Sequence, residues 1–121
     1  MKVKRIKIGI RELKAVLDDF VMTGEAIERG EKIKKEKGIY FTNFEAFRKA
    51  LTPKRLELLH LIKAKRPSSI NELARMAKRN VKNIAEDVKY LEQIGLIEKK
   101  ESLAKMAPVI AYDKLLLEIA V

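Results

Sequence analysis

The chain of 121 residues contains no cysteine. Without thiols it can form neither a disulfide nor a thiolate metal site, and a cytoplasmic location is the default expectation for such a composition. His60 is the only histidine, so the His-His and His-Cys spacings of metal sites are missing as well. We therefore expect no bound metal and no cofactor.

Long apolar runs are also lacking. No stretch approaches the ~18 residues that a membrane-spanning helix needs, and residues 1–7 are charged and lack the apolar block of a signal peptide. Glycine-rich nucleotide-binding loops of the Gly-x-Gly-x-x-Gly and Walker types do not occur in the sequence. No buried pair of carboxylates can be identified either. The sequence therefore argues against a membrane protein and against an enzyme.

Positive charge is unevenly distributed along the chain. The formal net charge is +10, and residues 48–82 hold eleven Lys and Arg against two Glu, which accounts for +9 of it. An ordinary solvated surface would spread this charge over the whole chain. The concentration of bases in one segment predicts a surface for a polyanion such as nucleic acid.

The basic segment runs into a helix-turn-helix pattern at residues 68–96. A first short helix begins at a capping box, in which Ser69 and Glu72 each satisfy a backbone N–H of the other. A second helix over residues 80–94 begins at an Asn80 cap and is followed by Gly95. Apolar residues recur along it at helical spacing and define a face that we expect to be buried: Val81, Ile84, Ala85, Val88, Leu91 and Ile94.

The opposite face of the second helix is polar. It carries Lys82, Asn83, Glu86, Lys89, Tyr90 and Gln93. Most of these side chains hydrogen-bond readily to base edges or phosphates, so the pattern predicts a helix that enters the major groove of DNA. Asn80 has a competing role as a helix cap. We expect Asp87 to pair with a nearby base such as Arg75 and to serve structure.

Other elements flank this motif. In chain order they are a strand at residues 2–10, a helix at 11–30, a strand or extended linker at 39–41, helices at 43–51 and 53–65, and hairpin strands at 96–100 and 107–111. Residues 115–121 form a final strand or short helix, and the Ile and Val near the end favour the strand. Helices followed by a two-stranded hairpin have the order of a winged helix. We therefore expect an α+β fold, with a winged helix-turn-helix domain at residues 38–121 and a strand-helix arm at residues 1–37.

Candidate DNA contacts come from three places: the start of the first motif helix, the turn with the second helix, and the hairpin. They are Ser68, Ser69, Asn71, Lys78, Arg79, Asn80, Lys82, Asn83, Glu86, Lys89, Lys99, Lys100 and Lys105. Side chains near the start of the second helix reach deepest into the groove, which favours Lys82, Asn83 and Glu86 as base readers. Lys78 and Arg79 are expected to contact phosphates. A cap alone explains Ser69 equally well.

The arm carries an apolar stripe at helical spacing. Its residues are Leu13, Val16, Leu17, Phe20, Val21 and Ile27. The stripe can pack on the chain's own core, or it can form an interface with a second copy or with another protein, and we favour the dimer. We expect the strand at residues 3–10 to have open edges that could add to a partner's sheet.

Several segments resemble MarR-type winged-helix regulators of archaea and bacteria. The segments are residues 51–59 (LTPKRLELL), 68–74 (SSINELA), 81–84 (VKNI) with 87–89 (DVK), and 91–98 (LEQIGLIE). The tail at residues 108–113 (PVIAYD) is similar to that of a family of small archaeal predicted DNA-binding proteins. The resemblance implies a dimeric DNA-binding transcription factor, and some members of the narrower family are thought to be antitoxins. Long dimerisation helices at both ends, which MarR-type proteins carry, are not expected here.

The expected function is thus that of a homodimeric regulator, a repressor, that reads double-stranded DNA with helix 80–94. The alternative is an antitoxin that binds a small toxin through its N-terminal arm and represses its own operon. An RNA-binding winged helix is a third hypothesis. Base stacking on single strands needs exposed aromatic rings, and only Tyr90 of the three tyrosines lies on the polar face, which gives this hypothesis little support.

Overall fold

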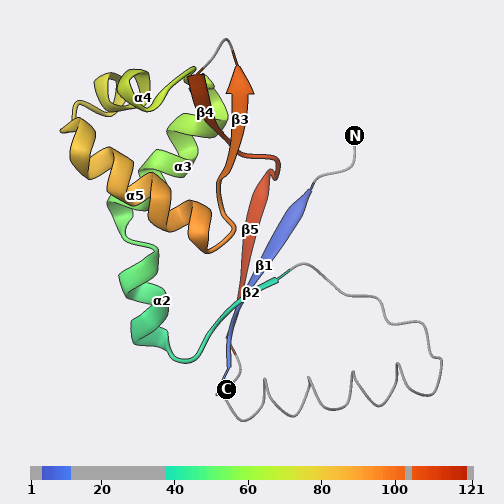
Figure 1. The fold of residues 1–121 in the computed structure, drawn as a ribbon. Helices are drawn as coiled ribbons and strands as arrows, with labels where there is room; N and C mark the ends of the chain where they lie inside the picture. Colours follow the sequence, from blue (N-terminus) through green and yellow to red (C-terminus); the bar gives the residue numbers. More distant parts are fainter. Residues whose placement is uncertain (1–3, 12–37, 103–104, 120–121) are drawn as a thin grey trace. The chain divides into compact units, whose positions relative to one another are not determined.

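The computed structural model describes residues 4–11, 38–102 and 105–119. The chain forms two compact units, one from residues 1–48 with 112–121 and the other from residues 49–111. Figure 1 shows the elements of both units along the chain. Within the described ranges, no helix is long and apolar enough to cross a membrane.

A parallel sheet of three strands forms the first unit. Its strands are β1 (Arg5–Ile10), β2 (Gly38–Phe41) and β5 (Lys114–Ile119), in the order β2-β1-β5. Both pairings in this sheet are parallel, and β1 is the central strand. Within the described residues, the strands expected at 2–10 and 115–121 are confirmed, and residues 39–41 are a strand.

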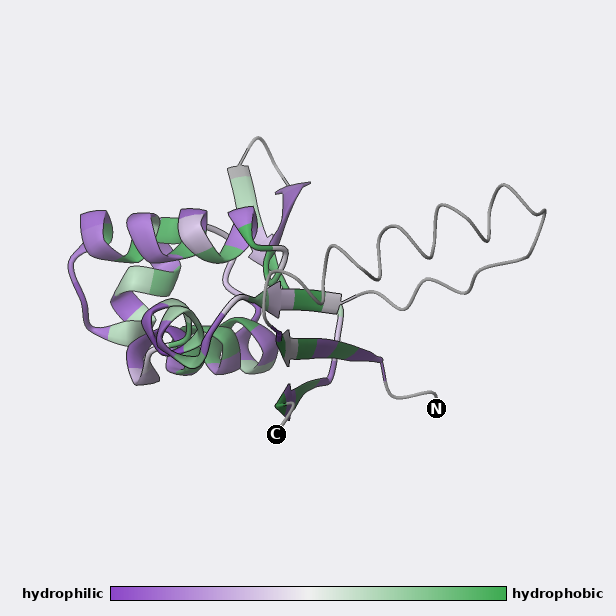
Figure 2. Ribbon diagram, turned by 90° about the horizontal axis from the view of Figure 1, so that it is seen from below, coloured by the Kyte–Doolittle hydropathy of each residue, from purple (hydrophilic) through white to green (hydrophobic). Residues whose placement is uncertain are grey.

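Alternation of side chains gives this sheet one apolar face. Ile8 lies opposite Ile39 on β2 and opposite Leu117 on β5, and its side chain is only 2% exposed. Figure 2 shows hydrophobic stretches along all three strands. On the other face the Tyr40 ring lies against Gly9, where a Cβ atom would come within 2.7 Å of the ring. A glycine is therefore needed in the middle of β1 for this close approach.

The open edges expected for the strand at residues 3–10 are wrong, because β1 is paired on both sides. The partner β5 comes from the other end of the chain, and local sequence patterns carry no information about such a pairing. The same pairing places residues 112–121 in the unit of the N-terminal strand. The boundary expected at residue 37 thus differs from the division that the strands produce. The expected helix at residues 11–30 and the stripe from Leu13 to Ile27 lie outside the described residues.

Helix α2 (Phe44–Ala50) follows β2. The side chain of Asn43 caps it, with Oδ1 accepting a hydrogen bond from the Ala46 N–H at 2.8 Å. Phe47 on this helix packs edge-on against Phe41 of β2, with 5.9 Å between ring centroids. An aromatic contact therefore fixes α2 against the end of the strand that precedes it.

Three helices and a hairpin make up the second unit. They are α3 (Pro53–Lys65), α4 (Ile70–Ala77), α5 (Val81–Gln93) and the antiparallel pair β3 (Glu98–Ser102) and β4 (Lys105–Val109). Thr52 caps α3 and Pro53 occupies its first turn, as the sequence predicts. The core is apolar and comes from every helix: Leu58, Leu59, Ile62, Leu73, Ala74, Ile84, Val88 and Leu91, with Leu96 and Ile97 from the segment before β3. The α+β class is confirmed, and a β-hairpin follows α5.

Candidate nucleic-acid interface

A three-residue turn joins α4 to α5. Lys78 ends α4 in the left-handed conformation, with φ of 54°, and the Arg79 N–H donates to the Ala74 carbonyl at 3.1 Å. Asn80 then caps α5, because its Oδ1 accepts a hydrogen bond from the Lys82 N–H at 2.8 Å. The cap predicted for Asn80 is confirmed, and its side-chain oxygen is occupied by the backbone.

Gly95 terminates α5. Its φ of 93° allows the Leu96 N–H to donate to the Leu91 carbonyl at 2.8 Å, while the Gly95 N–H donates to the Glu92 carbonyl at 3.1 Å. These two bonds form a Schellman motif, in which a glycine supplies the left-handed residue after the helix. The helix thus spans Val81–Gln93, within one residue of the expected limits at each end.

One face of α5 is buried. Ile84, Val88 and Leu91 are each at most 1% exposed and anchor the helix in the core of the unit. The sequence also assigned Val81 and Ala85 to this face, but both are exposed, and Val81 retains 45% of its surface. Both positions lie on one flank of the helix, roughly 50° (Val81) and roughly 90° (Ala85) from the centre of the buried row.

The polar face of α5 is exposed along its whole length. Lys82, Glu86, Lys89 and Gln93 form its central row, at helical spacings of three and four residues. Asn83 is exposed beside this row. Tyr90 differs from the expectation, because its ring is half-buried and lies 4.2 Å from the guanidinium carbon of Arg55. Its aromatic face is therefore occupied within the unit.

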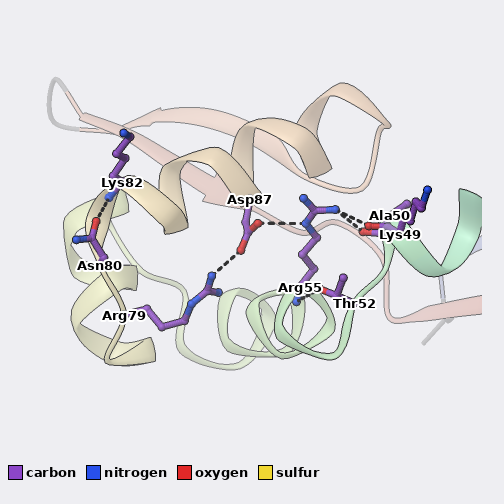
Figure 3. Close-up of polar contacts among 8 residues, drawn as sticks. All are labelled: Lys49, Ala50, Thr52, Arg55, Arg79, Asn80, Lys82 and Asp87. Atoms are coloured by element: carbon purple, nitrogen blue, oxygen red, sulfur yellow. Dashed lines mark hydrogen bonds and ion pairs between the residues drawn. The ribbon is translucent and has the colours of Figure 1, made fainter.

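Asp87 on the flank of α5 binds side chains from α3 and from the turn between α4 and α5, as Figure 3 shows. Its Oδ1 accepts a hydrogen bond from Arg55 Nε on α3 at 3.1 Å, and its Oδ2 accepts one from Arg79 Nη2 in the turn at 2.8 Å. Arg55 Nη1 also donates to the carbonyls of Lys49 and Ala50, at 2.9 and 3.0 Å. We refer to Asp87, Arg55 and Arg79 as the Asp87 cluster. It fixes the rotation of α5 about its own axis.

The pairing of Asp87 with Arg75 expected from the sequence is wrong. Arg75 lies on the exposed side of α4, whereas the left-handed residue Lys78 turns the chain so that Arg79 faces Asp87. Arg79, expected to contact phosphate, is only 23% exposed at its side chain and donates to this carboxylate. Its role in the described structure is therefore to hold the turn against α5.

The start of α4 contains three of the candidate residues. Ser69 Oγ accepts a hydrogen bond from the Glu72 N–H at 3.1 Å, so half of the predicted capping box is confirmed. The Glu72 carboxylate instead accepts a hydrogen bond from Ser68 Oγ at 2.7 Å. Both hydroxyls thus serve the helix terminus, and Asn71 is exposed beside them.

The hairpin contributes three candidate lysines. Lys99 lies opposite Pro108 in the ladder, and its Nζ forms an ion pair with Glu92 Oε2 of α5 at 3.2 Å. Lys100 is exposed. Lys105 pairs with Ser102 at the end of the ladder, and its side chain lies outside the described part. The ion pair of Lys99 links the base of the hairpin to the last turn of α5.

A cavity of about 500 Å³ lies between the end of α3 and the hairpin. Three bases line it, Lys63, Arg66 and Lys100, together with apolar residues of β4, and no residue of α5 takes part. The exposed row of α5 therefore does not line this cavity. Among the described residues, no group of His, Asp and Glu is arranged to hold a metal ion.

Comparison with known proteins gives one family. No curated protein sequence matches the chain. A family model named HVO_A0114 matches residues 50–117, from the end of α2 through α5 and the hairpin into β5. The match covers more than half of the 121 residues and includes the whole exposed row of α5. The chain therefore belongs to the HVO_A0114 family.

Proposed function

We propose that this chain is a DNA-binding transcriptional regulator of the winged helix-turn-helix type. In this proposal α5 enters the major groove, α4 lies across the groove entrance, and the β3–β4 hairpin is the wing. The observation that carries it is the division of α5: Ile84 and Val88 are buried, while Lys82, Glu86 and Lys89 stand exposed on the other side. Because the apolar face of α5 is packed in the core, the polar row on its opposite face is presented as one rigid surface.

Base contacts are assigned to the first two turns of α5. Lys82 can donate to guanine, Asn83 can pair with adenine, and Glu86 can accept from the amino group of cytosine. Val81 and Ala85 are additional candidates, because exposed apolar side chains at these positions suit the methyl group of thymine. The sequence pattern assigned both to the core, so only their exposure identifies them.

Phosphate contacts are assigned to exposed residues around this helix. Lys78 lies in the turn before α5, Lys89 lies on α5 itself, Asn71 and Arg75 lie on α4, and Lys100 lies on the hairpin. Arg55 and Arg79 are left out of the phosphate set because they bind Asp87. Since such contacts release counterions from DNA, binding should weaken steeply as salt rises.

The resemblance to MarR-type regulators supports the finer assignment of a homodimeric repressor, which reads two half-sites related by a two-fold axis. For the antitoxin alternative, the physical support was the open edge of the strand at residues 3–10. Both edges of β1 are occupied. The proposed function is accordingly DNA binding.

The test is binding to duplex DNA at several salt concentrations, measured by fluorescence anisotropy. We expect the double variant Lys82→Gln with Lys89→Gln to bind all sequences more weakly and to lower the salt slope by about 2. Lys4→Gln with Arg5→Gln removes the same charge from the start of β1 and is the matched control. An unchanged salt slope in the α5 variant would rule out this surface.

Selection from a random duplex library gives the second readout. The wild-type chain should enrich one motif, and its symmetry would show whether two copies bind. A chain that enriches no duplex sequence, with a salt slope equal to that of the α5 variant, would contradict the proposal.

A further inference from the structure

The outer edge of β5 is the feature that the proposed function leaves unexplained. Strand β5 pairs with β1 on one side, and no other described strand pairs with its opposite side. Three consecutive residues of this strand, Leu115–Leu117, are leucine, and Leu116 and Leu117 are 43% and 46% exposed. Natural proteins protect an edge strand with charges, prolines or bulges at its centre, and β5 has none of these there.

The direction of the backbone groups is fixed by the pairing with β1. The Lys114 N–H donates to the Lys4 carbonyl on β1 at 3.3 Å. Because backbone groups alternate along a strand, the N–H groups of Leu116 and Glu118 also face β1. Those of Leu115 and Leu117 face the outer edge. Two adjacent donor-acceptor positions are thus presented outward in the middle of the leucine run.

We propose that β5 pairs antiparallel with β5 of a second copy of this chain, with the two-fold axis at Leu116. The two sheets then continue into one of order β2-β1-β5-β5-β1-β2. An isologous contact of this kind requires a strand that is complementary to itself. The proposal deepens the proposed homodimeric regulator by naming an interface, and it does not use the DNA surface.

Charge complementarity selects the register. A two-fold axis normal to the sheet places the same face of both copies on the same side of the joined sheet. One residue of β5 must then lie directly opposite its own copy, at the axis. Leu115, Leu116 and Leu117 are the three candidates for this residue. When it passes through Leu116, Lys114 lies opposite Glu118 of the partner twice, and Leu115 lies opposite Leu117 twice. When it passes through Leu115 or Leu117, one of the charged residues lies opposite a leucine. Only the register at Leu116 pairs both charges and all leucines.

The geometry within one copy agrees with this register. Glu118 forms an ion pair with Lys7 on β1 at 2.8 Å, so its carboxylate lies over the same face as Leu116 and Lys114. In the dimer, positions 114, 116 and 118 would form non-hydrogen-bonded pairs, in which opposite side chains approach most closely. Lys114 of the second copy would therefore reach the Glu118 carboxylate, which Lys7 already binds. The leucine pairs on the other face would cover Leu117.

Cross-linking tests the register directly, because the native chain has no cysteine. Leu116→Cys places two thiols across the axis at a Cα separation of roughly 4.5 Å, within the range of a disulfide. Leu117→Cys is the control, since its two copies would lie on a diagonal, at or beyond the disulfide limit of about 7 Å. We expect a covalent dimer from Leu116→Cys on mild oxidation and at least tenfold less from Leu117→Cys. Equal cross-linking of the two variants would overturn the register.

Charge reversal with mixing tests the same pairing without cysteine. Lys114→Glu and Glu118→Lys should each place like charges opposite one another and sediment at the 13.9 kDa mass of one chain. Mixed in equal amounts, they should restore a species of twice that mass, because each reversed charge meets its opposite. Circular dichroism of each variant checks that the sheet remains folded.

A wild-type chain that stays at 13.9 kDa at 100 µM would overturn the interface, as would a Lys114→Glu variant that still dimerises. These readouts use no DNA. A dimer that passes both tests but binds no duplex would refute the proposed function and leave the β5 interface intact. A monomer that binds DNA with a steep salt slope would refute the β5 interface and leave the proposed function intact.

Discussion

The carboxylate of Asp87 and the guanidinium of Arg79 are joined by a hydrogen bond of 2.8 Å between α5 and the turn that precedes it. Arg55 of α3 occupies the other carboxylate oxygen. Arg79 belongs to the basic segment at residues 48–82, but its guanidinium holds the turn against α5. This contact controls the orientation of α5 and adds no positive charge to the exposed surface.

Asp87→Ala should therefore destabilise the chain. It leaves two half-buried guanidinium groups without their carboxylate, which costs roughly 2–3 kcal/mol and lowers the melting temperature by roughly 6–15 °C. Calorimetry or thermal circular dichroism measures the change. Glu86→Ala, one residue earlier on the exposed face, is the matched control and should stay within about 0.5 kcal/mol of the native chain. Equal losses of stability in the two variants would show that the Asp87 cluster does not stabilise the fold.

Asn80→Ala should lower stability by about 1 kcal/mol, because the Lys82 N–H loses its acceptor. Asn80→Ser retains an acceptor and should recover most of this stability. If Asn80 were mainly a base reader, the serine variant would unfold like the native chain yet select a different DNA motif. Chemical denaturation and library selection on the same two variants separate the cap from the base contact.

Asn83→Ala is expected to leave stability almost unchanged, since the side chain is exposed on α5. Loss of a bidentate contact with adenine should relax preference at one base pair, by about 1–3 kcal/mol of discrimination. The measurement is the motif enriched by the variant beside that of the native chain. Two identical motifs would remove Asn83 from the base-reading set.

Tyr112 gives a prediction in alkaline solution. Burial raises the pKa of its phenol from 10.0 to about 12. The unfolded chain releases this proton at lower pH than the folded chain, so the contribution of Tyr112 to stability falls as pH rises from about 10 to 12. Phenolate absorbance should show one tyrosine that titrates near pH 12 in the native chain and is lost in Tyr112→Phe. A late transition that persists in the variant would contradict the assignment.

Local signals in the sequence predicted much of the second unit. Caps at Thr52, Ser69 and Asn80 and the stop at Gly95 each involve groups within five residues of one another, so short patterns contain them. Helical periodicity located the exposed row of α5 for the same reason. It failed at Val81 and Ala85, because an apolar residue on the flank of a helix satisfies the pattern whether or not another element covers it.

Contacts between distant segments were not predictable in this way. Asp87 is 32 residues from Arg55, and several basic residues of similar character were available to it. The pairing of Lys4 with Asp113 spans 109 residues. Choosing among such partners requires the positions of whole helices and strands, which no short pattern encodes.

The parallel pairing of β1 with β5 also sets an order of events during synthesis. Residues 49–111 are contiguous, so their helices and hairpin can fold as soon as they have left the ribosome. Strand β1 is made early, but the neighbour that completes its pairing ends at Ile119. Closing a loop of this length is slow compared with forming local contacts. The part of the described chain that is synthesised first is therefore among the last to reach its folded state.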